Sequence, residues 1–211
     1  MTGQNDAVPG PGGMSALSVN LVIVCTGSVN AATLPTAVGG LRITTPEVRQ
    51  QLVVTRSATR FVSMDALSVI TGRPTLLDVW PDSFTSAPHM ELVEWADAFL
   101  VYPATAHYFA RLAHGLAATP SLLALLGTAA PIAIAPAMPE GVWENAITRR
   151  NAAALAELPN VTVVPPVPGR SWSTGRDTGS LPPPFTHVLR PLLVRLAERT
   201  LAPKADSGLQ G

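Results

Sequence analysis

Short apolar runs recur along the chain, and stretches with helically spaced apolar residues separate them. Continuous runs of this kind are typical of strands that are buried on both faces of a parallel sheet. A last such run is followed by a long segment without periodicity. The pattern predicts strands at Leu17–Cys25, Gln51–Thr55, Ala98–Tyr102, Ile132–Ala135 and Val161–Val164, with a short extended piece at Leu76–Val79.

Helices are expected in the intervals between these strands. Ser28 or Asn30 is placed to cap the first helix, where Pro35 is tolerated in the first turn. Ser57 is placed to cap the second helix, which would turn Phe61 and two later apolar residues to one side. Further helical spacing is found at Phe109–Leu116, Val142–Leu158 and Thr186–Leu201.

Strands that alternate with helices predict an α/β fold with a parallel sheet and helices on both faces. We therefore expect one Rossmann-like or flavodoxin-like domain over residues 15–203, with flexible tails at 1–14 and 204–211. At 211 residues the length suits a single domain.

Composition narrows the classes of function. The formal net charge is +0 and the pI is about 6.9, so neither nucleic acid nor an anionic membrane is an expected partner. Charged residues make up 13% of the chain, which is low for a domain whose surface faces water, and we expect a homo-oligomer. Residues 1–14 lack the basic start of a secretory signal, and Gly127, Pro131 and Pro136 interrupt the apolar stretch 122–138. A cytoplasmic protein is expected.

Cys25 is the only cysteine. A single thiol excludes an intrachain disulfide and a multi-cysteine metal site, and no metal is expected. Because Cys25 lies within an apolar run, we interpret it as a buried strand residue and not as a nucleophile.

The predicted strand ends carry the candidate chemistry. Ligands of parallel α/β sheets bind at the carboxyl ends of the strands. Here those ends are small or hydroxyl-bearing segments, which suit a phosphate-bearing cofactor, although no Gly-x-Gly-x-x-Gly fingerprint is present. They are Thr26-Gly27-Ser28, Thr55-Arg56-Ser57, Pro103-Ala104-Thr105 and Pro136-Ala137-Met138.

These motifs, in this order, resemble the homo-oligomeric flavin-containing cysteine decarboxylases. That family includes phosphopantothenoylcysteine decarboxylase and the epidermin-type enzymes of lanthipeptide biosynthesis. His89-Met90-Glu91-Leu92 with Ala96-Asp97 is similar to the segment that holds the family's catalytic histidine. Ser173-Thr174-Gly175-Arg176 resembles the substrate clamp of the peptide-modifying branch.

The resemblance implies a flavin, FMN or alternatively FAD, and an assembly of trimers or dodecamers. It implies oxidation of a C-terminal cysteine to a thioaldehyde, an electron sink that lets carbon dioxide leave and gives an enethiol. His89 would act as the base near the thiol. The implied flavin contacts are Gly27, Ser28, Asn30, Ser57, Phe61, Pro103, Ala104, Thr105, Ala106 and His107, and the implied substrate contacts are Met138, Asn145, Ser173, Gly175 and Arg176.

Two positions depart from the family pattern. His107 stands where the motif continues with Asn, so either its ring replaces the amide or that contact is lost. Pro139 stands where an Asn helps to bind the substrate carboxylate, and proline offers neither a polar side chain nor an N–H. Arg176, Asn145 or backbone N–H groups near Gly141 would have to take that role.

The segment 165–184 is rich in proline and glycine, and we predict no helix or strand in it. We interpret it as a substrate lid.

Three hypotheses follow for the whole chain. The favoured one is oxidative decarboxylation of the C-terminal cysteine of a ribosomal precursor peptide, and the alternatives are a phosphopantothenoylcysteine decarboxylase of coenzyme A synthesis and a non-catalytic flavin-binding or regulatory subunit.

Overall fold

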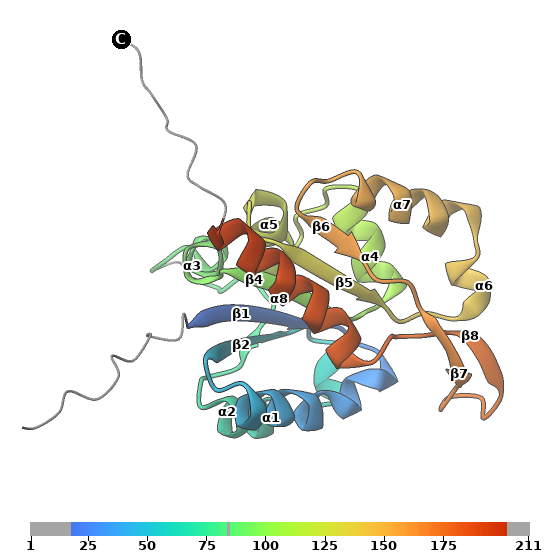
Figure 1. Ribbon diagram of the computed structural model, residues 1–211, viewed down its shortest axis with the longest axis horizontal. Coiled ribbons are helices and arrows are strands. Elements are labelled where there is room, and N and C mark those ends of the chain that lie inside the picture. The colour runs from blue at the N-terminus through green and yellow to red at the C-terminus, as the bar shows by residue number, and fades with distance from the viewer. Residues whose placement is uncertain (1–17, 84, 202–211) are drawn as a thin grey trace, which may run out of the picture.

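A parallel sheet forms the middle layer of the molecule (Figure 1). The computed structural model describes residues 18–83 and 85–201, so the expected tails and the outer limits of the expected domain lie outside the described residues. Within them the sheet has six strands in the order β3-β2-β1-β4-β5-β6. This is the doubly wound order, and the expected α/β fold is confirmed. The strands are β1 Val19–Cys25, β2 Val48–Val54, β3 Leu76–Leu77, β4 Ala98–Ala104, β5 Ile132–Pro136 and β6 Val161–Val163.

Helices cover both faces of the sheet. One face packs against α1 (Leu34–Thr44), α2 (Met64–Thr71) and α8 (Phe185–Leu201). The other packs against α3 (Pro88–Trp95), α4 (Ala106–Ala113), α5 (Pro120–Gly127), α6 (Glu140–Trp143) and α7 (Ala146–Ala156). Two short 3-10 helices, η1 (Val29–Thr33) and η2 (Ala58–Arg60), follow β1 and β2. Among the described helices, none has the length and apolarity that crossing a membrane requires.

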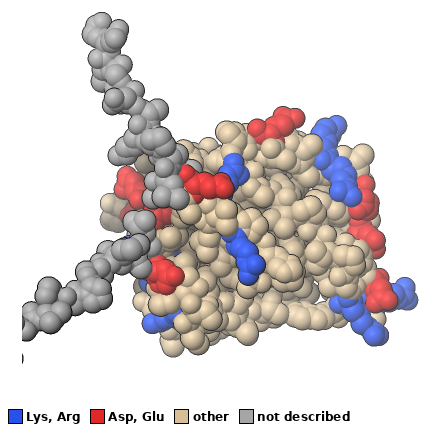
Figure 2. All heavy atoms as spheres, in the orientation of Figure 1, with Lys and Arg blue, Asp and Glu red and all other residues tan. Residues whose placement is uncertain are grey.

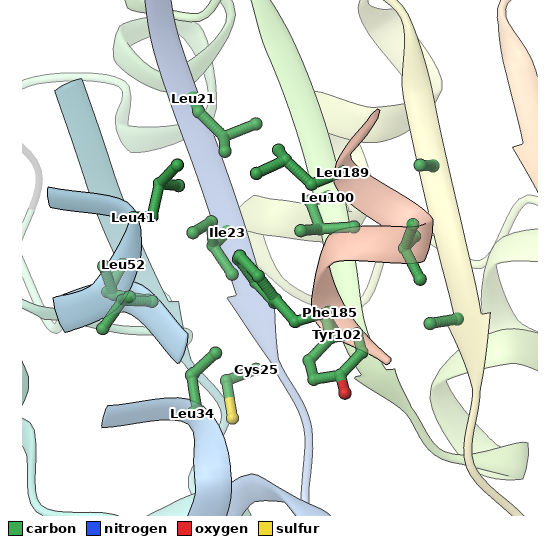
Figure 3. Packing of buried hydrophobic residues seen from close by; sticks show 14 of the residues in the cluster. Leu21, Ile23, Cys25, Leu34, Leu41, Leu52, Leu100, Tyr102, Phe185 and Leu189 are labelled. Carbon is green, nitrogen blue, oxygen red and sulfur yellow. The ribbon is translucent and has the colours of Figure 1, made fainter. Parts of the chain in front are cut away.

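The central strand β1 divides the core in two. Leu21, Ile23 and Cys25 point to the side of α1 and α8, where Leu34 and Phe185 close over them (Figure 3). The alternate residues of β1 belong to the cluster on the other face, because successive side chains of a strand point to opposite faces. Burial raises the pKa of the Cys25 thiol from 9.0 to about 12, which agrees with a packing role.

The second helical region differs from its prediction. Strand β2 begins at Val48, three residues before the predicted start, because residues 48–50 pair with residues 19–21 of β1. The polar Gln50 is accommodated in the core by a hydrogen bond from its Nε2 to the Val38 carbonyl at 3.1 Å. Ser57 makes no side-chain cap, and Phe61 is 38% exposed. The helix begins after Ser63, whose hydroxyl accepts from the Ala66 N–H at 3.2 Å.

Two later helices are also shorter than predicted. Helix α4 ends at Ala113, and Leu116 lies beyond it on the surface. The predicted helix 142–158 is divided into α6 and α7, since Asn145 has an extended backbone and its Oδ1 accepts from the Ile147 N–H at 2.9 Å. A capping side chain of this type starts a new helix.

The proline-rich segment after β6 forms an antiparallel hairpin, so the prediction that it holds no strand is wrong. Strand β7 (Val167–Arg170) pairs with β8 (Asp177–Leu181). Its turn is closed by the Ser171 N–H, which donates to the Arg176 carbonyl at 2.8 Å, and Gly175 lies there at φ +65°. Backbone pairing holds the hairpin, and for that reason apolar periodicity does not reveal it.

Candidate functional site

From β1 the chain adds β2 and β3 on one side of the sheet and then returns to add β4, β5 and β6 on the other side, so the strand order reverses between β1 and β4. Such a reversal opens a crevice outside the carboxyl ends of the strands. In Figure 1 the arrowheads of β1, β4 and β5 point to the side where the β7–β8 hairpin lies. The predicted site segments therefore meet at one edge of the sheet.

Thr26 joins the two central strand ends. Its hydroxyl donates to the Pro103 carbonyl at 2.7 Å and accepts from the Thr105 N–H at 2.8 Å. The Ala137 N–H donates to the Ala104 carbonyl at 2.8 Å and ties β5 to the same edge. These bonds fix the backbone of the three segments relative to one another.

A cavity of about 860 Å³ opens at this edge, and we call it the strand-end cavity. Its volume is in the range of about 300–1,000 Å³ that is usual for cofactor sites. One wall is formed by the ends of β1, β4 and β5, and the opposite wall by the hairpin. His107 and Arg176 bring positive or protonatable groups to it, and Glu140 and Asp177 bring carboxylates.

Most of the predicted residues line this cavity. The predicted flavin contacts that do so are Gly27, Ser28, Asn30, Phe61, Thr105, Ala106 and His107, and the predicted substrate contacts are Met138, Ser173 and Arg176. Ser28 is in turn oriented by Asn30, whose backbone N–H and Nδ2 donate to the Ser28 hydroxyl at 3.3 and 3.2 Å. The roles of these residues stay predictions.

Five of the predicted flavin and substrate contacts lie elsewhere. Pro103 and Ala104 are buried in β4 behind the cavity wall, and Asn145 caps α7. Gly175 shapes the hairpin turn, and Ser57 lines an adjoining cavity. Sequence reasoning missed Trp172 and Glu140, which do line the strand-end cavity. The exposed Trp172, 62% accessible, was hidden because an isolated aromatic residue in a loop has no periodicity to mark it.

His89 does not line the strand-end cavity within the described chain. The sequence pattern assigns no helix to the segment around His89, yet this residue lies in the first turn of α3, directly after Pro88. Its ring packs edge-on against Trp80, with the centroids 5.7 Å apart, and its Nδ1 is a buried atom with no hydrogen-bond partner among the described residues. Figure 1 shows α3 and the β7–β8 hairpin at opposite ends of the view.

A buried polar chain lies behind the edge. Tyr108 and Ser121 share a hydrogen bond of 2.6 Å between their hydroxyl oxygens, and the Ser121 hydroxyl and N–H bond to the two carboxylate oxygens of Asp78 at 2.7 and 2.9 Å. Burial, with the nearby Asp78 charge, raises the pKa of Tyr108 well above its ordinary value. Tyr108 therefore stays a neutral hydrogen-bonding group.

The geometry fits a flavin nucleotide. Gly27 lets the backbone of the β1–η1 turn approach its neighbour so closely that a Cβ there would lie 2.6 Å from the Ser57 Cβ. A bare backbone of this kind, next to the Ser28 and Thr105 hydroxyls, is the environment in which a phosphate group finds donors. Among the described residues, no cluster of three or more potential metal-ligating side chains is found.

Fold and site together define a nucleotide-binding α/β protein of the flavin type. The Flavoprotein family matches residues 14–183, and the chain belongs to this family, whose members bind FMN. The cofactor prediction is thereby confirmed at the level of the family.

Curated relatives and solved structures agree with this assignment. The coenzyme A biosynthesis bifunctional protein CoaBC of Vibrio parahaemolyticus is 33% identical over 161 residues, 75% of this chain and 38% of that protein. The chain thus spans little more than a third of the length of this relative. The FMN-dependent cysteine decarboxylase SpaF has a TM-score of 0.72 at 26% identity, covering 86% of this chain and 99% of SpaF. The cypemycin decarboxylase CypD has a TM-score of 0.70 at 28% identity, covering 87% and 96%.

Proposed function

We propose that this protein is a flavin-dependent cysteine decarboxylase that acts on the C-terminal cysteine of a ribosomally made precursor peptide. The product would be the aminoenethiol used to form aminovinyl-cysteine in a lanthipeptide-type antibiotic. The observation that carries the proposal is the strand-end cavity. The strand-end residues that would hold a flavin form one of its walls, and the β7–β8 hairpin forms the opposite wall. The likeness to SpaF and CypD, both named as decarboxylases, supports it.

A bound flavin would supply the two-electron oxidation of the thiol that makes loss of carbon dioxide possible. The chain supplies position and charge. Gly27, Ser28, Asn30 and Thr105 would hold the cofactor against the ends of β1 and β4. Met138 would present an apolar surface to the cysteine side chain.

Arg176 would hold the substrate carboxylate. It lines the strand-end cavity, and its guanidinium makes no hydrogen bond or ion pair with any other described residue. A planar guanidinium matches a carboxylate with two parallel N–H groups. Arg176 would thereby replace the Asn that the family pattern has at position 139. Pro139 lines the same cavity and has no hydrogen-bond donor. Asn145, the other side chain considered for this role, is engaged as a helix cap.

The hairpin would act as the lid. Ser180 anchors its second strand by donating from its hydroxyl to the Met138 carbonyl at 2.8 Å, whereas the turn residues 171–176 have no such anchor to the sheet among the described residues. A fixed base with a free tip allows the tip to cover a peptide end and exclude water.

His89 would serve the cavity of a second copy of the chain. It is placed away from its own strand-end cavity, yet it is the residue that the family resemblance assigns as base. A homotrimer, or a dodecamer built from trimers, would bring the two together. Figure 2 supports an assembly, since the face that carries α1 and α8 in this view is largely free of charged side chains.

The alternative is phosphopantothenoylcysteine decarboxylation in coenzyme A synthesis, which the CoaBC likeness favours. The two substrates share a cysteine carboxylate and differ in what precedes it. Anaerobic mixing of the FMN-loaded protein with each substrate, followed by mass spectrometry of the product, separates them. Oxidative decarboxylation to an enethiol would leave the flavin reduced and bleach its visible absorbance, whereas decarboxylation to a saturated thiol is redox-neutral and would leave the flavin oxidised.

Synthetic peptides that end in cysteine should bleach the flavin, and their serine-terminated twins should not. Decarboxylation of phosphopantothenoylcysteine alone, to the saturated thiol and without lasting bleaching, would assign the protein to coenzyme A synthesis. A flavin-bound protein that releases carbon dioxide from neither substrate would point to the non-catalytic, flavin-binding subunit.

A further inference from the structure

A second cavity of about 540 Å³ adjoins the strand-end cavity, and the two share Thr105 and His107. We call it the arginine cavity, because Arg56, Arg60 and Arg111 line it. These side chains come from three different places in the chain: the end of β2, η2 and helix α4. Nothing in the proposed decarboxylation uses them.

The three guanidinium groups lack protein partners. Within the described part of the chain, an ion pair forms between Arg149 and Glu144 and not at any of the three cavity arginines. None of these three donates a side-chain hydrogen bond to a described residue. Asp78 is the carboxylate of the lining, and it is buried with both oxygens bonded to Ser121. Three positive charges that line one cavity favour an anion there over a cation.

Hydroxyl groups complete the lining. The Thr119 Oγ1 is a buried atom with no hydrogen-bond partner in the described part of the chain. A buried hydroxyl without a partner costs free energy, so it marks a place where a ligand atom is expected. Thr55 and Ser57, whose hydroxyl oxygens are 3.2 Å apart, line the same cavity. Guanidinium and hydroxyl donors together are the groups that bind a phosphoryl oxygen.

We propose that the arginine cavity binds a second phosphoryl group, in addition to the one carried by the FMN of the strand-end cavity. The proposal rests on the proposed function for the position of the flavin. Two sources offer this chemistry. FAD brings a second phosphate with its adenosine half, and a phosphorylated substrate such as phosphopantothenoylcysteine brings one of its own.

The first arm of the test titrates FMN and FAD into the wild type, Arg56→Ala and Arg111→Ala by flavin fluorescence. Arg49→Ala is the matched control, because Arg49 is an exposed arginine near the start of β2, away from the strand ends. The second arm measures the binding of phosphopantothenoylcysteine and of its dephosphorylated form to the FMN-loaded proteins. Removal of an arginine that binds a phosphate should weaken the phosphorylated ligand by about tenfold or more.

A loss confined to FAD assigns the cavity to the dinucleotide, and a loss confined to the phosphorylated substrate assigns it to the substrate. An equal loss for FMN and FAD would overturn the proposal, since the arginines would then hold the flavin's own phosphate. Unchanged affinity in both arms would overturn it as well. FMN binding and peptide turnover of the wild type are measured in the same series, so failure here leaves the proposed decarboxylation to be judged separately.

Discussion

Gly27 and Ser57 touch across the carboxyl edge of the sheet, from the turn after β1 to the turn after β2. A Cβ on Gly27 would lie 2.6 Å from the Ser57 Cβ and 3.0 Å from the Ser57 carbonyl carbon. The first contact is shorter than side-chain packing allows, and the second is very tight and involves backbone that cannot swing aside. The glycine therefore sets the distance between the two turns that wall the strand-end cavity and the arginine cavity.

We predict that Gly27→Ala folds but loses flavin binding. The added methyl group has to push the turns apart, which costs about 1–3 kcal/mol of stability and displaces Ser28. Fluorescence quenching of FMN measures the binding, and circular dichroism confirms the fold. Gly141→Ala is the matched control, because no atom lies within 4 Å of a Cβ there. Flavin binding by Gly27→Ala at wild-type affinity would show that the cofactor lies elsewhere.

His89→Asn is expected to bind flavin and to lose turnover by about a hundred- to ten-thousand-fold, the usual cost of removing a general base.

Each variant alone, His89→Asn or Gly27→Ala, should be inactive. Co-expressed in one assembly they should regain activity, since intact flavin sites of the first would meet His89 of the second. Light scattering confirms that the mixed assembly forms. An inactive mixed assembly would place the base within the same chain or remove His89 from catalysis.

The sheet and most of the cavity wall follow from the sequence for physical reasons. Strands β1, β4 and β5 are buried on both faces, so their apolar runs mark them, and a parallel sheet brings their ends to one edge. The hairpin did not show in the sequence because β7 and β8 pair through backbone groups outside the core. The place of His89 was missed for another reason, since Pro88 is as compatible with a first helical turn as with a loop.

Arg176→Ala is predicted to weaken the binding of a cysteine-terminated peptide by about tenfold or more, because a charged hydrogen bond to the carboxylate is lost. Flavin affinity should not change. Arg170→Ala is the matched control, as Arg170 lies in the same hairpin and its Nε donates to the Gly175 carbonyl at 2.9 Å. Calorimetry with the peptide and with its C-terminal amide measures the effect. If the amide binds as tightly as the free acid, the carboxylate is not recognised by this arginine.

Stability is predicted to fall as the pH rises above about 9. The folded state raises the pKa of Cys25 from 9.0 to about 12, so above pH 9.0 the folded chain keeps a proton that the unfolded chain releases. Ionisation then favours unfolding by up to about 1.4 kcal/mol per pH unit. Urea unfolding at several alkaline pH values should show a shallower decline for Cys25→Ala, although burial also raises the pKa of Tyr102 and Tyr108. Equal slopes for wild type and variant would contradict the buried neutral thiol.

Oxidative decarboxylation of a C-terminal cysteine changes the mass of the peptide, so mass spectrometry of the product is the decisive measurement. The FMN-loaded protein is incubated with a cysteine-terminated peptide and, in parallel, with its serine-terminated twin. We expect the first peptide to lose carbon dioxide and two hydrogens, fragmentation to locate this loss at the last residue, and the twin to stay intact. If the cysteine peptide keeps its full mass while both flavin and peptide are bound, the protein is not a peptidyl-cysteine decarboxylase.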